Sequence, residues 1–256
     1  MDLGRYPGIR RLAADYSHDA EGLGDFYAGS PASPEAWRQV IARAQRHPRK
    51  RTELCDALAR QQARREAPPE ARAATQRLRA PDSVTVVTGQ QAGLFGGPLY
   101  TLLKAITALK LAAQIRRDYD VPAEAVFWIE SEDHDWNEVN LCQVLDAELQ
   151  PRAVKLPDPE DAGRVPVASV KLDGSVEAGI SQLVDVLPPT EFTGDMIAGL
   201  RSAYAQGRGM AEAFGRWLEL VLGRSGLIVY DAADPATKPL VGHIFAHEAA
   251  FAGRTT

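Results

Sequence analysis

Three features that the sequence lacks or has little of exclude whole classes of protein. The chain has only two cysteines, Cys55 and Cys142, in 256 residues, too few for the disulfide framework of many small secreted domains. No apolar stretch approaches the roughly 20 residues that a membrane-spanning helix needs. The N-terminus also lacks the apolar segment of a signal peptide. We therefore expect a cytoplasmic protein that does not enter a membrane.

Three familiar enzyme signatures are missing as well. The sequence has a glycine-rich segment at residues 89–97. No Gly-Lys-Ser/Thr follows it at the spacing of a Walker A loop, and the segment lacks the usual dinucleotide-binding fingerprint. No Gly-X-Ser-X-Gly nucleophile elbow occurs. The chemistry must therefore be sought in other patterns.

The charge distribution is uneven. The formal net charge is −5, yet the stretch from Arg38 to Arg79 has 12 Lys/Arg against 4 Asp/Glu. Such a stretch could face a nucleic acid, but it has no interleaved aromatic residues and the whole chain is acidic. We expect a solvated arginine face and no nucleic-acid partner.

The most informative segment is "VTVVTGQQAGLFGGPLYTLL", from Val84 to Leu103. Its β-branched run, residues 85–88, predicts a buried strand in the middle of a parallel sheet. Pro98 is well suited to the first turn of a helix. The apolar residues that follow have helical spacing and predict one buried face: Leu99, Leu102, Leu103, Ile106, Leu109 and Leu111.

The turn between this strand and helix is a candidate binding site. Its glycines permit close backbone approaches, and the helix N-terminus offers free amides that favour a phosphate, a carboxylate or an oxyanion. Lys104 could reach back toward such an anion, although an exposed lysine is more often only solvated. A tight structural turn is the alternative. The predicted binding residues here are Thr88, Gly89, Gln90, Gln91, Gly93, Gly97 and Lys104.

A second segment, "AVFWIESEDHDWNEVN", joins an apolar strand at 125–129 to a dense acidic cluster. Its strand starts about forty residues after the first, which fits a strand-helix-strand unit. Ligands of open α/β sheets bind where the strands end. If the two strands are neighbours, the acidic cluster and the glycine turn should line the same crevice.

Within this cluster, we predict His134 as a general acid or base, assisted by Asp133 or Asp135. Alternation along an extended segment would place His134 and Glu132 opposite the two aspartates. A metal site is an alternative, but no second His or Cys stands at ligand spacing, so we predict none. A solvated acidic loop is the other alternative. Glu132 and Asn137 are further candidate binding residues.

The remaining sequence suggests more core elements around an insertion. "SPEAWRQVIARAQ" predicts a helix over 34–65 with Ser33 as its cap, and a second helix should cover "PPEARAATQRLRA". The run "VPVASVKL" suggests a β-hairpin, residues 195–222 have helical spacing, and "GLIVYDAADP" predicts a third strand. Asp231 and Asp234 follow it, as ligands for a ribose, amine or sugar hydroxyl or as ordinary turn residues.

We therefore expect an α/β fold with a parallel-sheet core in four parts. An N-terminal helical segment covers residues 1–80, and the first part of the core covers 81–145. An inserted connective region covers 146–194. A helix and a return to the core cover 195–256.

The two informative segments together resemble the bacillithiol biosynthesis cysteine-adding enzymes, and "GLIVYDAADPATKPL" resembles that family's next strand. The resemblance implies a Rossmann-like core related in shape to class I aminoacyl-tRNA synthetases. It also implies a ligase that joins cysteine to the amine of glucosaminyl malate in the last pathway step. Amide formation needs an activated carboxyl, so ATP with magnesium is expected if the cysteine carboxylate is activated on the enzyme; the sequence does not reveal which activated species is used. Family members are longer and form homodimers through a coiled coil, so we expect this chain to be an N-terminal portion without it.

Two other functions remain open on the residues alone. A similar fold and loop could serve another ATP-dependent ligase or a nucleotidyltransferase-like enzyme, because a fold does not fix the substrate. A truncated, non-catalytic binding module is the second alternative.

Overall fold

The computed structural model describes residues 7–18, 20–24, 26–47 and 49–251. The chain forms two compact units, Met1–Arg49 and Lys50–Thr256. The first unit is helical, with α1 (Arg11–His18), the short 3-10 helix η2 (Ala20–Leu23) and α2 (Pro34–Arg46).

Helix α2 begins as predicted and ends earlier than predicted. The Ser33 side chain caps it by accepting a hydrogen bond from the Ala36 amide at 3.2 Å. The prediction of one helix over 34–65 is wrong, because the chain becomes extended at His47. Pro48 follows in the sequence, and a residue before proline disfavours the helical conformation. A separate helix, α3, starts at Arg51.

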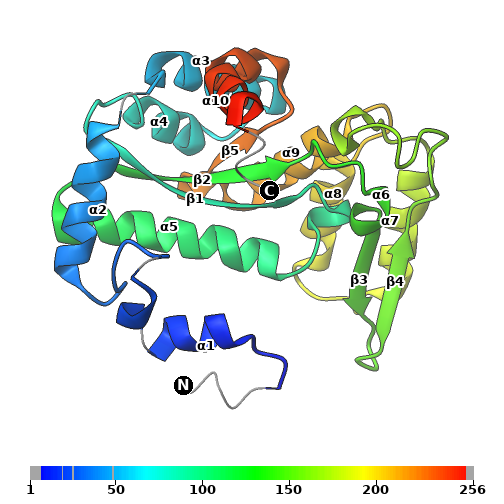
Figure 1. Cartoon of the computed structure of the whole chain (residues 1–256). Helices are drawn as coiled ribbons and strands as arrows, with labels where there is room; N and C mark the ends of the chain where they lie inside the picture. The colour runs from blue at the N-terminus through cyan, green and yellow to red at the C-terminus, as the bar shows by residue number, and fades with distance from the viewer. Residues whose placement is uncertain (1–6, 19, 25, 48, 252–256) are drawn as a thin grey trace. The chain divides into compact units, whose positions relative to one another are not determined.

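The second unit contains a parallel sheet with the order β1-β2-β5, shown in Figure 1. Its strands are β1 (Val84–Gln91), β2 (Ala123–Glu130) and β5 (Ile228–Asp231). Helix α5 (Tyr100–Tyr119) connects β1 to β2, so the predicted strand-helix-strand unit and the α/β, Rossmann-like fold are confirmed. The register pairs Gln91 with Glu130 and Ile129 with Asp231, which aligns the carboxyl ends of all three strands.

The central strand of the described sheet is β2, and β1 lies at its edge. The prediction that β1 occupies the middle is therefore wrong for the part of the chain that the structure describes. Val87 of β1 is 57% exposed, whereas β2 is buried along nearly its whole length. A β-branched run reports a preference for the pleated conformation and does not report how many neighbours the strand has.

Helix α5 also buries a different face from the predicted one. Its buried positions include Ala105, Ala108 and Ala112, and the predicted Leu99 is 73% exposed. The helix packs against both β1 and β2. Small side chains allow this close approach, so the leucines are displaced to the flanks of the contact.

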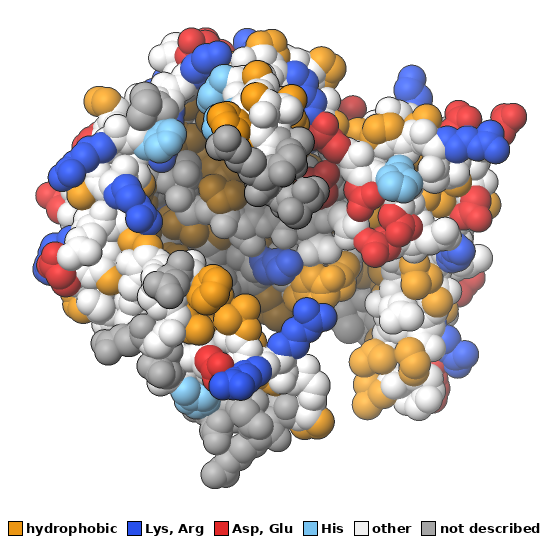
Figure 2. All heavy atoms as spheres, viewed as in Figure 1, with side chains coloured by type: hydrophobic (Ala, Val, Ile, Leu, Met, Phe, Trp, Pro, Cys, Tyr) orange, Lys and Arg blue, Asp and Glu red, His pale blue; other side chains and the backbone are white. Residues whose placement is uncertain are grey.

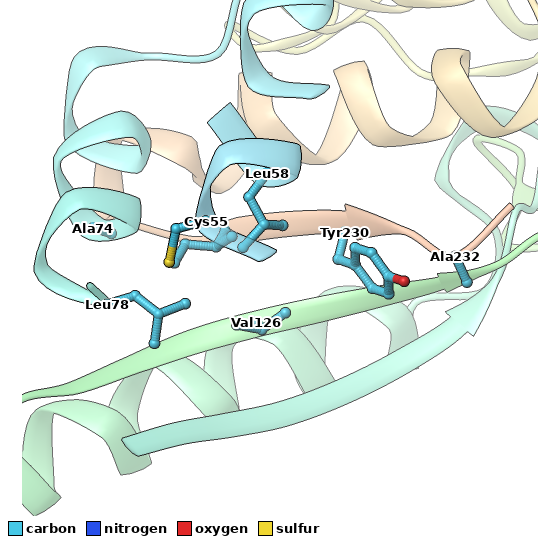
Figure 3. Close-up of a cluster of buried hydrophobic side chains, with 8 residues drawn as sticks. Cys55, Leu58, Ala74, Leu78, Val126, Tyr230 and Ala232 are labelled. Carbon is cyan, nitrogen blue, oxygen red and sulfur yellow. The ribbon is translucent and has the colours of Figure 1, made fainter. Parts of the chain in front are cut away.

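The opposite face of the sheet is covered by α3 (Arg51–Arg65) and α4 (Pro69–Arg77). Both helices belong to the second compact unit, which starts at Lys50. Figure 3 shows the apolar cluster that joins these helices to the strands. Its buried members are Cys55, Leu58, Ala74, Leu78, Val126, Ile228, Tyr230 and Ala232.

The segment after β2 leaves the sheet and returns at β5. It starts with the short helix α6 (Trp136–Val139) and an antiparallel hairpin of β3 (Leu141–Leu145) and β4 (Pro151–Lys155). The hairpin is thus earlier than predicted. The predicted hairpin run instead contains the 3-10 turn η4 (Val167–Ser169), whose amides bond to the Asp133 and Ser131 carbonyls at 2.8 and 2.9 Å.

Helices complete the unit. The other helices and 3-10 turns of this unit are η3 (Leu94–Gly96), α7 (Ser175–Val186), α8 (Thr193–Ala203), α9 (Met210–Leu222), η5 (Gly223–Ser225), η6 (Pro235–Thr237) and α10 (Lys238–Phe251). The predicted helical region at 195–222 is confirmed as two helices. None of the described helices combines the length and apolar character that crossing a membrane requires.

Candidate functional site

The glycine turn and the acidic segment meet at the carboxyl ends of β1 and β2, as predicted for neighbouring strands. The Gln91 side-chain amide donates to an Asp133 carboxylate oxygen at 3.1 Å and also donates to Glu138. One glutamine at the end of β1 therefore joins the two segments that the sequence singled out.

Internal packing accounts for several of the glycines. A Cβ on Gly93 would lie 2.7 Å from the Gly97 Cα, and one on Gly89 would lie 2.6 Å from the Trp128 carbonyl oxygen. Gly97 also has a φ of +68°, which favours glycine. Packing and backbone conformation explain these glycines, so the glycines alone do not identify a ligand.

A residue that the sequence did not single out holds this turn. Tyr204 lies just after α8 and is 1% exposed. Its hydroxyl donates to the Gly93 carbonyl at 2.8 Å and accepts from the Gly96 amide at 2.8 Å. More than a hundred residues separate the partners, and no local sequence pattern signals such a contact.

Polar side chains also project from the two sides of the turn. The Lys104 ammonium donates to the Gln90 side-chain oxygen at 2.9 Å and lies 3.5 Å from the Gly89 carbonyl oxygen. It also lies 5.0 Å from the Tyr100 ring centroid, within cation–π range. Lys104 is exposed and reaches back toward the strand end, as predicted. Thr88 is half-buried within β1.

Thr101 adds a buried polar group to the first turn of α5. Its side chain is fully buried, and the described structure gives its hydroxyl no hydrogen-bond partner. A Cβ on Gly97 would lie 3.4 Å from that hydroxyl oxygen. The start of α5 thus places an unsatisfied hydroxyl next to the glycine turn.

On the acidic side, Asp133 and His134 are adjacent. His134 Nδ1 lies 3.5 Å from an Asp133 carboxylate oxygen, and the histidine side chain is 73% exposed. The separation onto opposite faces does not occur, because β2 ends at Glu130 and the next residues are not extended strand. The Asp135 amide donates to Asp133 at 3.2 Å. This bond and the one from Gln91 lower the Asp133 pKa, so Asp133 is ionised beside the imidazole.

The other candidates in the acidic segment have separate surroundings. Asp135 and Asn137 are exposed, and Glu132 pairs with Lys238 of α10. Figure 2 shows acidic side chains gathered on the face where Figure 1 labels α6 and α7. Within the described ranges, no three Asp, Glu, His or Cys side chains form a group able to hold a metal ion.

Asp231 ends β5 and Asp234 follows it, and the fold uses their carboxylates to different extents. Asp231 accepts hydrogen bonds through one oxygen, from the Ser131 hydroxyl at 2.7 Å and the Ala233 amide at 3.1 Å. It thereby links the ends of β2 and β5.

Asp234 is committed to the fold. It binds Arg64 at 2.7 Å and Gln61 at 3.1 Å, and it caps η6 through the Ala236 amide. Burial opposes ionisation of Asp234, but these bonds outweigh it and lower the pKa. Ordinary structural chemistry therefore accounts for Asp234.

Comparison with known proteins places this arrangement in a family. The model of "Bacillithiol biosynthesis BshC, N-terminal Rossmann-like domain" matches residues 4–252. A "Putative cysteine ligase BshC" of Salinibacter ruber is 34% identical over 244 residues, which is 95% of this chain and 44% of that protein. The Chlorobaculum tepidum protein of the same name is 33% identical over 255 residues, 94% of this chain and 44% of that protein.

The chain spans less than half the length of these relatives. The match nevertheless covers every described residue, including the glycine turn and the acidic segment. The chain therefore belongs to the bacillithiol biosynthesis BshC family and comprises its N-terminal Rossmann-like domain.

Proposed function

We propose that this chain is the Rossmann-like part of a ligase that adds cysteine to glucosaminyl malate in the last step of bacillithiol biosynthesis. The observation that carries the proposal is the convergence of a cation, a helix N-terminus and an aspartate–histidine pair at the carboxyl ends of neighbouring strands. The names of the relatives support the reaction class.

The glycine turn and the start of α5 are suited to binding the malyl carboxylates. Lys104 supplies a positive charge next to Gln90, and the start of α5 adds the positive end of its helix dipole. Gln91, Gly93 and Gly97 shape the backbone of this side. A dicarboxylate would be recognised here by charge and by directional hydrogen bonds together.

The acidic side suits the proton transfer. The amine nitrogen of glucosaminyl malate attacks the activated carboxyl carbon of cysteine, so a carbon–nitrogen bond forms and the activating group leaves with its bonding electrons. His134 accepts the proton that the amine loses. The ionised Asp133, 3.5 Å away, stabilises the imidazolium that results.

Activation of the cysteine carboxyl is the role we assign to ATP with magnesium. Magnesium in nucleotide sites is usually held by phosphates and one or two carboxylates rather than by a complete protein cage. Asp231 lies at the end of β5 and has a second carboxylate oxygen. Glu132, Asp135 and Asn137 are exposed on the segment that follows β2. These residues would hold the nucleotide, its metal or the cysteine ammonium.

Turnover tests the proposal directly. We expect the purified chain, given cysteine, glucosaminyl malate, ATP and magnesium, to form a thiol product with the mass of both substrates minus one water. His134→Ala should lower the rate by about a hundredfold or more, because general base catalysis typically contributes that much. His247→Ala removes another exposed imidazole, in α10 and outside the site, and is the matched control.

The outcomes separate the alternatives. Product without ATP would remove the nucleotide from the proposal. Equal rates for His134→Ala and the control would show that His134 is not the general base. If neither this chain nor the full-length Salinibacter ruber relative forms product, the proposed substrates are wrong and another ligase chemistry or a binding role is favoured.

Two further properties accompany the proposal because the family suggests them. They are a cytoplasmic location and a homodimer formed through a coiled coil. Sedimentation of a full-length relative tests the dimer, and a monomer would contradict it.

A further inference from the structure

The turn between β1 and α5 is closed by one buried hydroxyl. Tyr204 both donates to the Gly93 carbonyl and accepts from the Gly96 amide, at 2.8 Å each. Burial raises the pKa of this hydroxyl, so the proton that it donates is present across the working pH range of proteins. A phenol is suited to this double role because it is both donor and acceptor.

The conformation that Tyr204 holds is an unfavourable one for the sequence. Phe95 has a φ of +52°, which side chains other than glycine rarely adopt. Its ring meets the Tyr204 ring edge-to-face with centroids 5.3 Å apart. Gly96, with a φ of +98°, packs against the Trp217 indole. The turn therefore depends on contacts supplied by residues far along the chain.

The conformation of this turn sets the distance between the end of β1 and the start of α5. Gln90 and Gln91 stand at the entry of the turn, and α5 with Lys104 begins at its exit. The Lys104–Gln90 bond crosses from exit to entry. Any change in the turn would therefore change the distance between the cation and the strand end.

We propose that Tyr204 is a positioning residue of this site: its hydroxyl locks the Gly93–Gly97 turn so that Gln90, Lys104 and the start of α5 converge on the malyl carboxylates. This inference rests on the proposed function. Tyr204 does not touch the ligand. Because it follows α8, the chain that returns from the insertion also determines the shape of the binding site.

The test compares Tyr204→Phe with Tyr230→Phe in the 256-residue chain. Phenylalanine keeps the ring and removes only the hydroxyl. Tyr230 is also buried, and its hydroxyl bonds to Thr237 on the other side of the sheet. We expect Tyr204→Phe to raise the calorimetric Kd for glucosaminyl malate about tenfold, from the loss of two hydrogen bonds of ordinary strength. Tyr230→Phe should leave it unchanged.

Amide hydrogen exchange supplies the readout that general destabilisation would not reproduce. Exchange at Gly96 should accelerate in Tyr204→Phe under conditions where exchange at the β2 amides does not. A variant that merely lost stability would contain less folded protein with an unaltered Kd. The expected pattern combines a raised Kd, a folded sheet and an exposed Gly96 amide.

Each remaining outcome is decisive. A wild-type chain that does not bind glucosaminyl malate would refute the proposed function and the positioning role with it. A wild-type chain that binds, together with an equal Kd for Tyr204→Phe, would refute only the positioning role. If Tyr204→Phe does not fold, Phe95→Leu serves instead. It keeps both hydroxyl bonds but removes the ring contact, so the Kd should rise about two- to threefold, and an unchanged Kd would overturn the inference.

Discussion

A buried ion pair between α3 and α9 gives a specific prediction about the stability of the fold. Arg65 of α3 donates to both carboxylate oxygens of Glu219 of α9, at 2.9 and 2.8 Å, and also to the Val229 carbonyl of β5 at 2.7 Å. The two side chains are 3% and 2% exposed. Glu219→Gln keeps the shape and removes the charge, which leaves the guanidinium buried without its counterion.

The expected cost follows from this burial. Breaking one partner of a buried pair lowers the free energy of unfolding by about 3–5 kcal/mol, a large share of the roughly 5–15 kcal/mol that holds a domain together. The matched control is Glu177→Gln. Its arginine, Arg201, makes a similar bond at 2.9 Å, but the side chains are 47% and 58% exposed. Solvent screening limits that loss to below about 1 kcal/mol.

Urea unfolding followed by circular dichroism measures both values. If the reasoning holds, the midpoint of Glu219→Gln falls well below that of Glu177→Gln at an unchanged slope. A Glu219→Gln protein within about 1 kcal/mol of wild type would refute the argument, since the buried guanidinium would then have found another way to be stabilised.

Two further predictions concern the site. Because the Asp135 amide and then Gln91 lower the Asp133 pKa, the stabilisation from Asp133 is present at neutral pH and is lost as the pH falls below the ordinary aspartate value of about 3.9. Carbon-detected NMR should show Gln91→Ala moving this pKa upward, and an unmoved pKa would count against the contact. Gly96→Ala should cost about 1–3 kcal/mol, because the added methyl would lie 2.6 Å from the indole nitrogen at a φ of +98°. Gly194→Ala, in α8 with open space around it, should be neutral or stabilising by thermal melting, and equal losses for the two variants would contradict this account.

The sequence could predict the elements of the site but only part of their packing. A β-branched run located β1, an apolar run located β2, and helical spacing located α5. Their parallel pairing followed from the length of the connection. What failed was the buried face of α5. Leucine spacing identifies an apolar stripe, whereas the contact with the sheet is decided by which side chains are small enough to approach it, namely Ala105, Ala108 and Ala112.

Long-range contacts explain the remaining differences. Nothing near Tyr204 in the sequence predicts a bond to Gly93 and Gly96, because more than a hundred residues separate the partners. Similarly, the run at 165–172 is rich in β-forming residues, yet its amides are used by the carbonyls of Ser131 and Asp133. These amides therefore bond to the loop that carries His134 and not to the second strand of a hairpin.

The binding of glucosaminyl malate to the strand ends is the central claim, and an NMR titration of the isotope-labelled chain tests it most directly. The account predicts saturable shifts of the Gln90, Gln91 and Lys104 amides and of the His134 ring, while the β3–β4 hairpin amides stay in place. Shifts confined to the hairpin, or no shifts at millimolar ligand, would contradict it.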